Sequence, residues 1–230
     1  MTLDVTRIQG LCFDVDGTLN DTDDQIARTL AGWLKPFKAI LPGQDPQPIA
    51  RRLVMFSEAP GNFILWVPDR LAIDDEIARM LEWFHKIGLP EKKPYFELIE
   101  GIRPMLEALS QHYPLSIVSA RGEKSTRKFL DQFELTPFFR CVAGAQTCAR
   151  TKPYADPILW SAEQMGIAPA NCLMIGDTPV DIRAGRAAGA QTVGVLCGFG
   201  AEKELRRHGA DFILNSTVEL GEILLKKSSI

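Results

Sequence analysis

Short apolar runs alternate with longer amphipathic runs along the second half of the chain. The apolar runs at 115–118, 138–142, 172–175 and 192–196 have the length of buried strands, and a further run of this kind lies near the start of the chain at 8–13. Apolar residues follow helical spacing at 123–133, at 155–165 and in the stretch that ends at 188. Strands that alternate with helices are typical of parallel strand–helix–strand units. The pattern therefore predicts an α/β fold with a parallel sheet.

A different pattern lies between residues 22 and 93, after the first predicted strand. Apolar residues there follow helical spacing without a convincing strand. The stretch is divided into short helices by Pro36, Pro42, Pro46, Pro48, Pro60 and Pro68. Lys92, Lys93 and Pro94 are typical of a linker that returns to the α/β part. We predict two domains: an α/β core made of 1–21 and 94–230, and an inserted all-helical domain at 22–93.

Composition and charge narrow the class of protein. The 230 residues include 26 Lys and Arg against 29 Asp and Glu, so the formal net charge is −3. Since no basic run stands out, neither nucleic acid nor an anionic membrane surface is an expected partner. The first residues lack the apolar segment of a signal or transit peptide, and no apolar stretch approaches about 20 residues. Five cysteines without CxxC spacing indicate reduced thiols, so we expect a soluble cytoplasmic protein.

The first predicted strand runs directly into Asp14-Val15-Asp16-Gly17-Thr18. In open α/β sheets, ligands gather at the carboxyl ends of the strands. The two-residue period of a strand puts Asp14 and Asp16 on the same side, which is costly for two anions unless a cation joins them. An Asp-Gly hairpin turn is the common alternative, but it leaves the pair of acids unexplained.

Two weaker signals follow later in the chain. Ser119 ends the strand at 115–118, where its hydroxyl and the N–H of Ala120 could bind a phosphoryl oxygen, although serine at a strand end is more often a turn residue. Lys152 precedes Pro153 and could offset the charge of a carboxylate and a phosphate, although an isolated lysine is usually on the surface. Neither signal identifies a site by itself.

The fourth predicted strand ends in Gly176-Asp177, and a helix follows. Thr178 suits the N-cap of that helix and Pro179 suits its first position. Asp181 then falls in the first turn, where the helix dipole favours an acid, so it serves as a cap residue, as a metal-site residue or as both. Asp177 lies outside the helix and has no such structural explanation.

In this order and at these strand ends, the four segments resemble the haloacid dehalogenase superfamily of phosphotransferases. DxDGT followed by GDxxxD is a specific combination, and the resemblance spans nearly the whole chain. It implies a doubly wound, Rossmann-like α/β core, and the inserted helical segment looks like a cap domain. The chain is most similar to the phosphoglycolate-phosphatase-like branch. It departs from that branch at Ala120 and Arg121, where Asn and Lys are common, and in 194–200, which lacks the usual tryptophan.

The resemblance implies a phosphatase that forms an aspartyl phosphate. Asp14 is then the nucleophile, and Asp16 protonates the leaving oxygen and later takes a proton from water. Lys152 neutralises charge. The implied substrate is a small phosphate monoester, either phosphoglycolate-like or a sugar phosphate.

The same resemblance implies how phosphate and metal are held. Thr18 helps to hold Asp16 and the phosphate, while Ser119 and the N–H of Ala120 bind phosphoryl oxygen. The cofactor is Mg²⁺, which prefers oxygen ligands. The implied Mg²⁺ ligands are Asp14, the main-chain carbonyl of Asp16, Asp177, and Asp181 either directly or through water.

Other activities share this core. Dehalogenases of the superfamily lack an acid at the position of Asp16, and phosphonate-cleaving relatives also depart from DxD. Sugar phosphomutases commonly carry a histidine soon after the first motif, whereas residues 21–26 include none. A phosphomutase and a non-catalytic binding protein remain the two alternatives, and the oligomeric state stays open.

Overall fold

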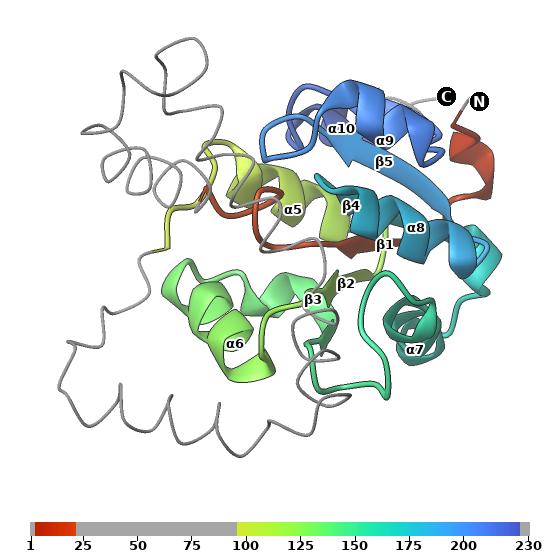
Figure 1. The fold of residues 1–230 in the computed structure, drawn as a ribbon. Coiled ribbons are helices and arrows are strands. Elements are labelled where there is room, and N and C mark those ends of the chain that lie inside the picture. The colour runs from red at the N-terminus through yellow and green to blue at the C-terminus, as the bar shows by residue number, and fades with distance from the viewer. Residues whose placement is uncertain (1–2, 22–95, 226–230) are drawn as a thin grey trace, which may run out of the picture. The chain divides into compact units, whose positions relative to one another are not determined.

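The computed structural model describes residues 3–21 and 96–225 (Figure 1). The predicted helical cap at 22–93 lies outside the described residues, so the cap and its boundaries stay a prediction. Among the described residues, six strands form one parallel sheet in the order β3-β2-β1-β4-β5-β6. The strands are β1 (Gly10–Phe13), β2 (Leu115–Val118), β3 (Phe139–Ala143), β4 (Cys172–Gly176), β5 (Gln191–Val195) and β6 (Phe212–Leu214).

Helices cover both faces of the sheet. The α-helices are α5 (Ile102–Ser110), α6 (Glu123–Gln132), α7 (Asp156–Met165), α8 (Pro179–Ala187), α9 (Glu202–Arg207) and α10 (Glu219–Leu225). The described residues also form the 3₁₀ turns η1 (Val5–Arg7), η4 (Thr136–Phe138) and η5 (Pro169–Asn171). The expected doubly wound, Rossmann-like α/β core is confirmed.

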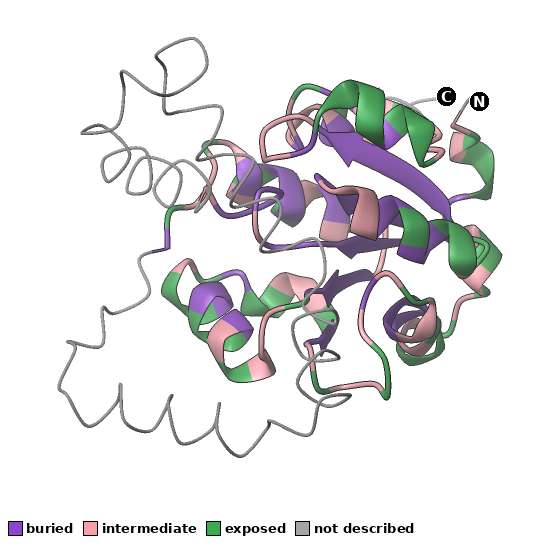
Figure 2. Cartoon of the chain, in the orientation of Figure 1, coloured by how far each residue is buried: buried purple, intermediate pink, exposed green. Residues whose placement is uncertain are grey.

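Successive residues of the central strands serve two different cores. Leu11 and Phe13 of β1 pack with α5, α6 and α10, whereas Cys12 between them packs with α7 and α8 on the other face. Because both faces are covered, these strands are buried throughout, as Figure 2 shows for the sheet. That is why they read as continuous apolar runs rather than as alternating patterns.

Strand order explains where a site can form. The chain continues from β1 to β2 and β3 on one side of the sheet, and then returns to β4, β5 and β6 on the other. Ligands of such sheets bind outside the carboxyl ends of the strands at this switch point. In β1, Phe13 pairs with Ile117 of β2 and with Ile175 of β4, so the three strands end at a common level.

The strands and helices predicted within the described residues agree with the structure to within two residues at each predicted boundary, which is the usual uncertainty of element ends. Four elements were not predicted: α5, α9, β6 and α10. The helix α5 did have a sequence signal, because its buried residues Ile102, Met105, Leu106 and Leu109 follow helical spacing. All five cysteines are free thiols. In the part of the chain that the structure describes, no helix has the length and apolar character needed to cross a membrane.

Candidate active site

A buried ion-pair network lies at the carboxyl ends of β1 and β4. The Nζ of Lys152 is 2.7 Å from Oδ1 of Asp14 and 2.6 Å from Oδ1 of Asp181. Asp14 follows β1 directly, and Lys152 is only 6% exposed. An ammonium is rarely buried unless it is paired, so Lys152 is not the solvated surface residue that an isolated lysine usually is.

The charges in this network favour either a bound cation next to Asp14 or a proton on its carboxylate. Burial raises the pKa of Asp14 to about 8; Lys152 opposes this rise, while Asp181 and Asp16 add to it. Burial acts to lower the pKa of Lys152, but its pairs with Asp14 and Asp181 outweigh burial and raise it. Lys152 is therefore charged, and its one positive charge does not balance the acids around it.

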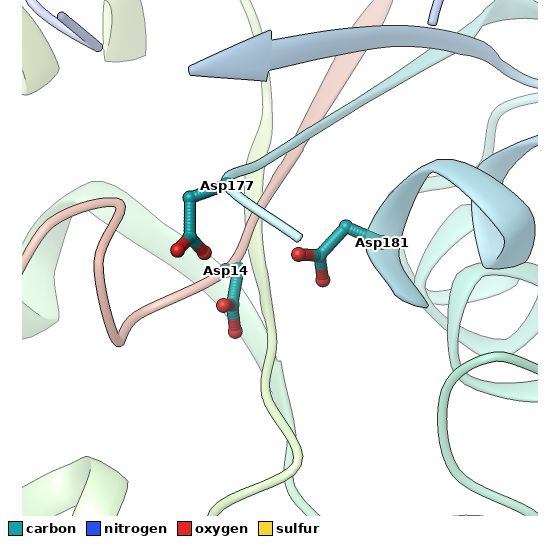
Figure 3. Close-up of side chains that lie close together, drawn as sticks. All are labelled: Asp14, Asp177 and Asp181. Carbon is teal, nitrogen blue, oxygen red and sulfur yellow. The ribbon is translucent and has the colours of Figure 1, made fainter. Parts of the chain in front are cut away.

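Three buried carboxylates converge beside Lys152. One oxygen from each of Asp14, Asp177 and Asp181 lies within 4.8 Å of the others, and Figure 3 shows the three side chains close together. Three hard anionic oxygens without a thiol or imidazole are the donor set that Mg²⁺ or Ca²⁺ prefers. The residues present therefore fit a divalent cation.

Asp181 has the capping role that its position suggested, and its carboxylate also belongs to the buried cluster, while metal binding stays a prediction. It lies in the first turn of α8, where its Oδ2 accepts hydrogen bonds from the N–H of Thr178 at 3.0 Å and from the Thr178 hydroxyl at 2.7 Å. Its Oδ1 pairs with Lys152. A Cβ at Gly176 would overlap the Asp181 carboxylate, so only glycine fits at the end of β4. Helix capping thus fixes the carboxylate that faces Lys152.

Asp177 is held by a glycine-containing loop after β5. Its side chain is fully buried, and its Oδ2 accepts a hydrogen bond from the N–H of Phe199 at 2.9 Å. A Cβ at Gly198 would overlap this oxygen and lie 2.6 Å from the carbonyl oxygen of Gly17. Sequence reasoning missed this support, because a backbone N–H has no residue signature.

We predict that Gly198→Ala weakens binding of a divalent cation about tenfold, because the new methyl group displaces Asp177. The measurement is the rise of Tm with Mg²⁺ concentration. Gly122→Ala is the matched control, since a Cβ there meets no atom within 4 Å. An unchanged Mg²⁺ response in Gly198→Ala would contradict the role given to this loop.

Asp16 lies beside this cluster, and its side chain faces a different partner. Its carboxylate is half-buried and forms an ion pair with Arg121. Its Oδ1 also accepts a hydrogen bond from Nδ2 of Asn20 at 3.3 Å. The sequence identified Arg121 as a departure from the related branch and gave no signal for a role of Asn20.

The predicted phosphate-binding residues lie around the same strand ends. Thr18 is fully buried; its carbonyl accepts a hydrogen bond from Thr217, and its hydroxyl has no hydrogen-bond partner among the described residues. Ser119 follows β2 and is buried, and its Oγ accepts a hydrogen bond from the N–H of Arg121 at 3.1 Å. This bond is the local turn contact expected of a serine at a strand end, whereas Ala120 is exposed.

The model of the family described as haloacid dehalogenase-like hydrolase matches residues 11–195. The chain belongs to this family. The match spans β1 to β5 and includes every predicted site residue. The resemblance drawn from the DxDGT and GDxxxD motifs is thereby confirmed.

Proteins similar to this haloacid dehalogenase-like hydrolase carry phosphatase names. A phosphoglycolate phosphatase of Aquifex aeolicus is 29% identical over 93% of this chain and 95% of its own length. A Clostridium perfringens protein named as a proposed pyrophosphatase is 26% identical over 96% of this chain and its whole length. The structure of a predicted phosphoglycolate phosphatase from Haemophilus somnus has a TM-score of 0.68 at 24% identity, covering 96% of this chain and 99% of that one. This last likeness shows a shared fold.

Proposed function

We propose that this hydrolase removes the phosphate group from a small phosphate monoester, using Mg²⁺ and a transient aspartyl phosphate at Asp14. The observation that carries the proposal is the pairing of buried Asp14 with Lys152 inside a cluster of carboxylates. A carboxylate nucleophile can approach a phosphate dianion only where positive charge offsets the repulsion. Lys152 supplies part of that charge.

The cation would be held by Asp14 and Asp177, with the main-chain carbonyl of Asp16 and with Asp181 either directly or through water. When bound, Mg²⁺ supplies further positive charge for the phosphoryl oxygens. Asp181 already binds Lys152 and Thr178 through its two oxygens, which favours the water-mediated contact.

The proposed reaction has two steps, and Asp16 acts as an acid in the first and as a base in the second. A carboxylate oxygen of Asp14 attacks phosphorus, the bond from phosphorus to the leaving oxygen breaks, and Asp16 gives that oxygen a proton. Water then attacks phosphorus, Asp16 takes the proton of the water, and the bond between phosphorus and Asp14 breaks. Ser119, the N–H of Ala120 and Thr18 would bind phosphoryl oxygens during both steps.

The substrate class follows from the names of the relatives together with the site. Relatives named for phosphoglycolate and for pyrophosphate support a small phosphorylated metabolite; a phosphoglycolate-like molecule or a sugar phosphate fits our proposal. Free cysteines suit a reducing compartment, so we place the enzyme in the cytoplasm. Neither nucleic acid nor a membrane is part of the proposal.

The direct test of the proposed function is turnover of a panel of small phosphate esters with Mg²⁺. The panel contains phosphoglycolate, sugar phosphates and p-nitrophenyl phosphate, together with the anhydride pyrophosphate. We expect release of inorganic phosphate from at least one ester and loss of release in EDTA. Absence of release from every ester would favour a non-catalytic protein, and isomerisation of a sugar phosphate without release would favour a phosphomutase.

We further predict that Mg²⁺ affinity depends on pH through Asp14. Because burial raises the pKa of Asp14 to about 8, protons compete with the cation below that pH. The dissociation constant for Mg²⁺ should fall about tenfold per unit between about pH 6 and pH 8 and then level off. Titration calorimetry at several pH values measures this. An affinity that stays constant over this range would contradict the prediction, and Asp14→Asn should remove the dependence.

A further inference from the structure

The carboxylate of Asp16 is held by two side chains: Arg121, which is 105 positions away in the sequence, and Asn20, which is four positions away. Nε of Arg121 donates a hydrogen bond to Oδ2 at 3.0 Å, and Nη2 of the same guanidinium donates to Oδ1. Nδ2 of Asn20 donates to Oδ1 from another direction. A planar guanidinium that binds both oxygens of a carboxylate fixes the plane of that carboxylate.

Arg121 is itself supported from several sides. Its guanidinium lies 5.2 Å from the ring centre of Phe96, a cation–π distance, and Phe96 packs edge-to-face on Phe129 of α6. The backbone N–H of Arg121 donates a hydrogen bond to Oγ of Ser119, and Nη1 of its guanidinium is 3.4 Å from Oγ of Ser125. The guanidinium is therefore a fixed donor rather than a mobile surface charge.

Asn20 is held equally firmly. It is fully buried, and its Oδ1 accepts a hydrogen bond from the N–H of Glu97 at 2.9 Å. Residue 20 pairs with Leu98 through an isolated antiparallel bridge. The second donor to Asp16 thus has a fixed position, set by the backbone of 97 and 98.

We propose that Arg121 is the positioning residue for Asp16, with Asn20 as the second support. The proposal rests on the function given above, in which Asp16 transfers protons to and from the substrate. Proton transfer needs the carboxylate within hydrogen-bond reach of the leaving oxygen, and an aspartate at a loop tip has free rotation unless it is held. Lysine, common at this position in the related branch, offers a point charge and cannot fix the plane of Asp16.

Direct contact between Arg121 and the substrate is the competing role. The two roles differ in what the loss of Arg121 changes. A substrate-binding arginine acts on every ester and still acts when Asp16 is replaced. A positioning residue acts only through Asp16, so its effect disappears once the carboxylate is gone.

The test is a double-mutant cycle of Arg121→Lys and Asp16→Asn, with kcat/KM measured for an alkyl phosphate and for p-nitrophenyl phosphate. Arg121→Lys should lower kcat/KM about tenfold or more for the alkyl ester, whose leaving oxygen needs a proton, and far less for the nitrophenyl ester. Its KM should stay near the wild-type value. In the Asp16→Asn background, Arg121→Lys should cause no further loss. Arg127→Met is the matched control, because Arg127 forms an exposed pair with Glu123 on α6.

Two different results would overturn the inference: one contradicts only the role of Arg121, and the other contradicts the proposed function. If the wild-type enzyme is active but the two substitutions are additive, or if both esters lose activity equally, Arg121 does not act through Asp16. If the wild-type enzyme hydrolyses neither ester with Mg²⁺, the proposed function itself fails, and the role of Arg121 fails with it.

Discussion

Asp14→Asn is expected to lower kcat by about five orders of magnitude, comparable to the loss of other covalent nucleophiles. The amide has the shape of the carboxylate but cannot form the acyl phosphate. Stability should be unchanged or higher, because burial already disfavours the charge of Asp14 and its pKa is raised to about 8. Turnover with Mg²⁺ and thermal unfolding in EDTA measure the two effects.

Asp211→Asn serves as the control for a lost acidic charge. Asp211 lies outside the carboxylate cluster, and its Oδ2 accepts a hydrogen bond from the N–H of Thr192 in β5. It should retain turnover. The nucleophile would have to be sought elsewhere if purified Asp14→Asn kept a rate near that of the wild type.

Lys152→Met should lower kcat about a thousandfold and also destabilise the fold. Methionine leaves Asp14 and Asp181 facing each other without the ammonium that binds both. Loss of one partner from a buried pair costs about 3 to 5 kcal/mol in the free energy of unfolding. The loss of a group that stabilises the charge developing in the transition state lowers the rate about a thousandfold.

The pH dependence of stability shows whether Lys152→Met destabilises the fold through the lost charge or only through a packing defect. Burial raises the pKa of Asp14 and Lys152 opposes that rise, so without Lys152 the Asp14 carboxylate binds a proton still more readily in the folded state than in the unfolded state. The variant should therefore lose stability relative to the wild type as pH rises from about 5 to 8. Urea unfolding at both pH values measures this difference, with the exposed Lys203→Met as control. A destabilisation that is independent of pH would indicate a packing effect alone.

The convergence of Asp14, Asp177 and Asp181 follows from motif and topology together. Two of these acids follow strands that turn out to be neighbours, and the third lies one helical turn beyond. Parallel strands bring their carboxyl ends to one edge, so strand-end acids far apart in sequence meet there. This part of the site was predictable without coordinates.

The supports of these acids were not predictable in the same way. Arg121 and Asp16 are separated by 105 positions, and their contact depends on the directions of two loop side chains. The contact from Phe199 to Asp177 uses a backbone N–H, which any residue carries. The burial of Lys152 likewise follows from its partners, whereas an isolated lysine in a sequence indicates the surface.

The most direct test of the central claim is to detect the acyl phosphate on Asp14 during turnover. Wild-type enzyme that is turning over p-nitrophenyl phosphate with Mg²⁺ is quenched in acid, reduced with borohydride, digested and examined by mass spectrometry. Reduction of an aspartyl phosphate leaves homoserine, so we predict homoserine at position 14 and none there in Asp14→Asn. Active enzyme that shows no modification at position 14, or shows it at another residue, would contradict the assignment of Asp14 as nucleophile.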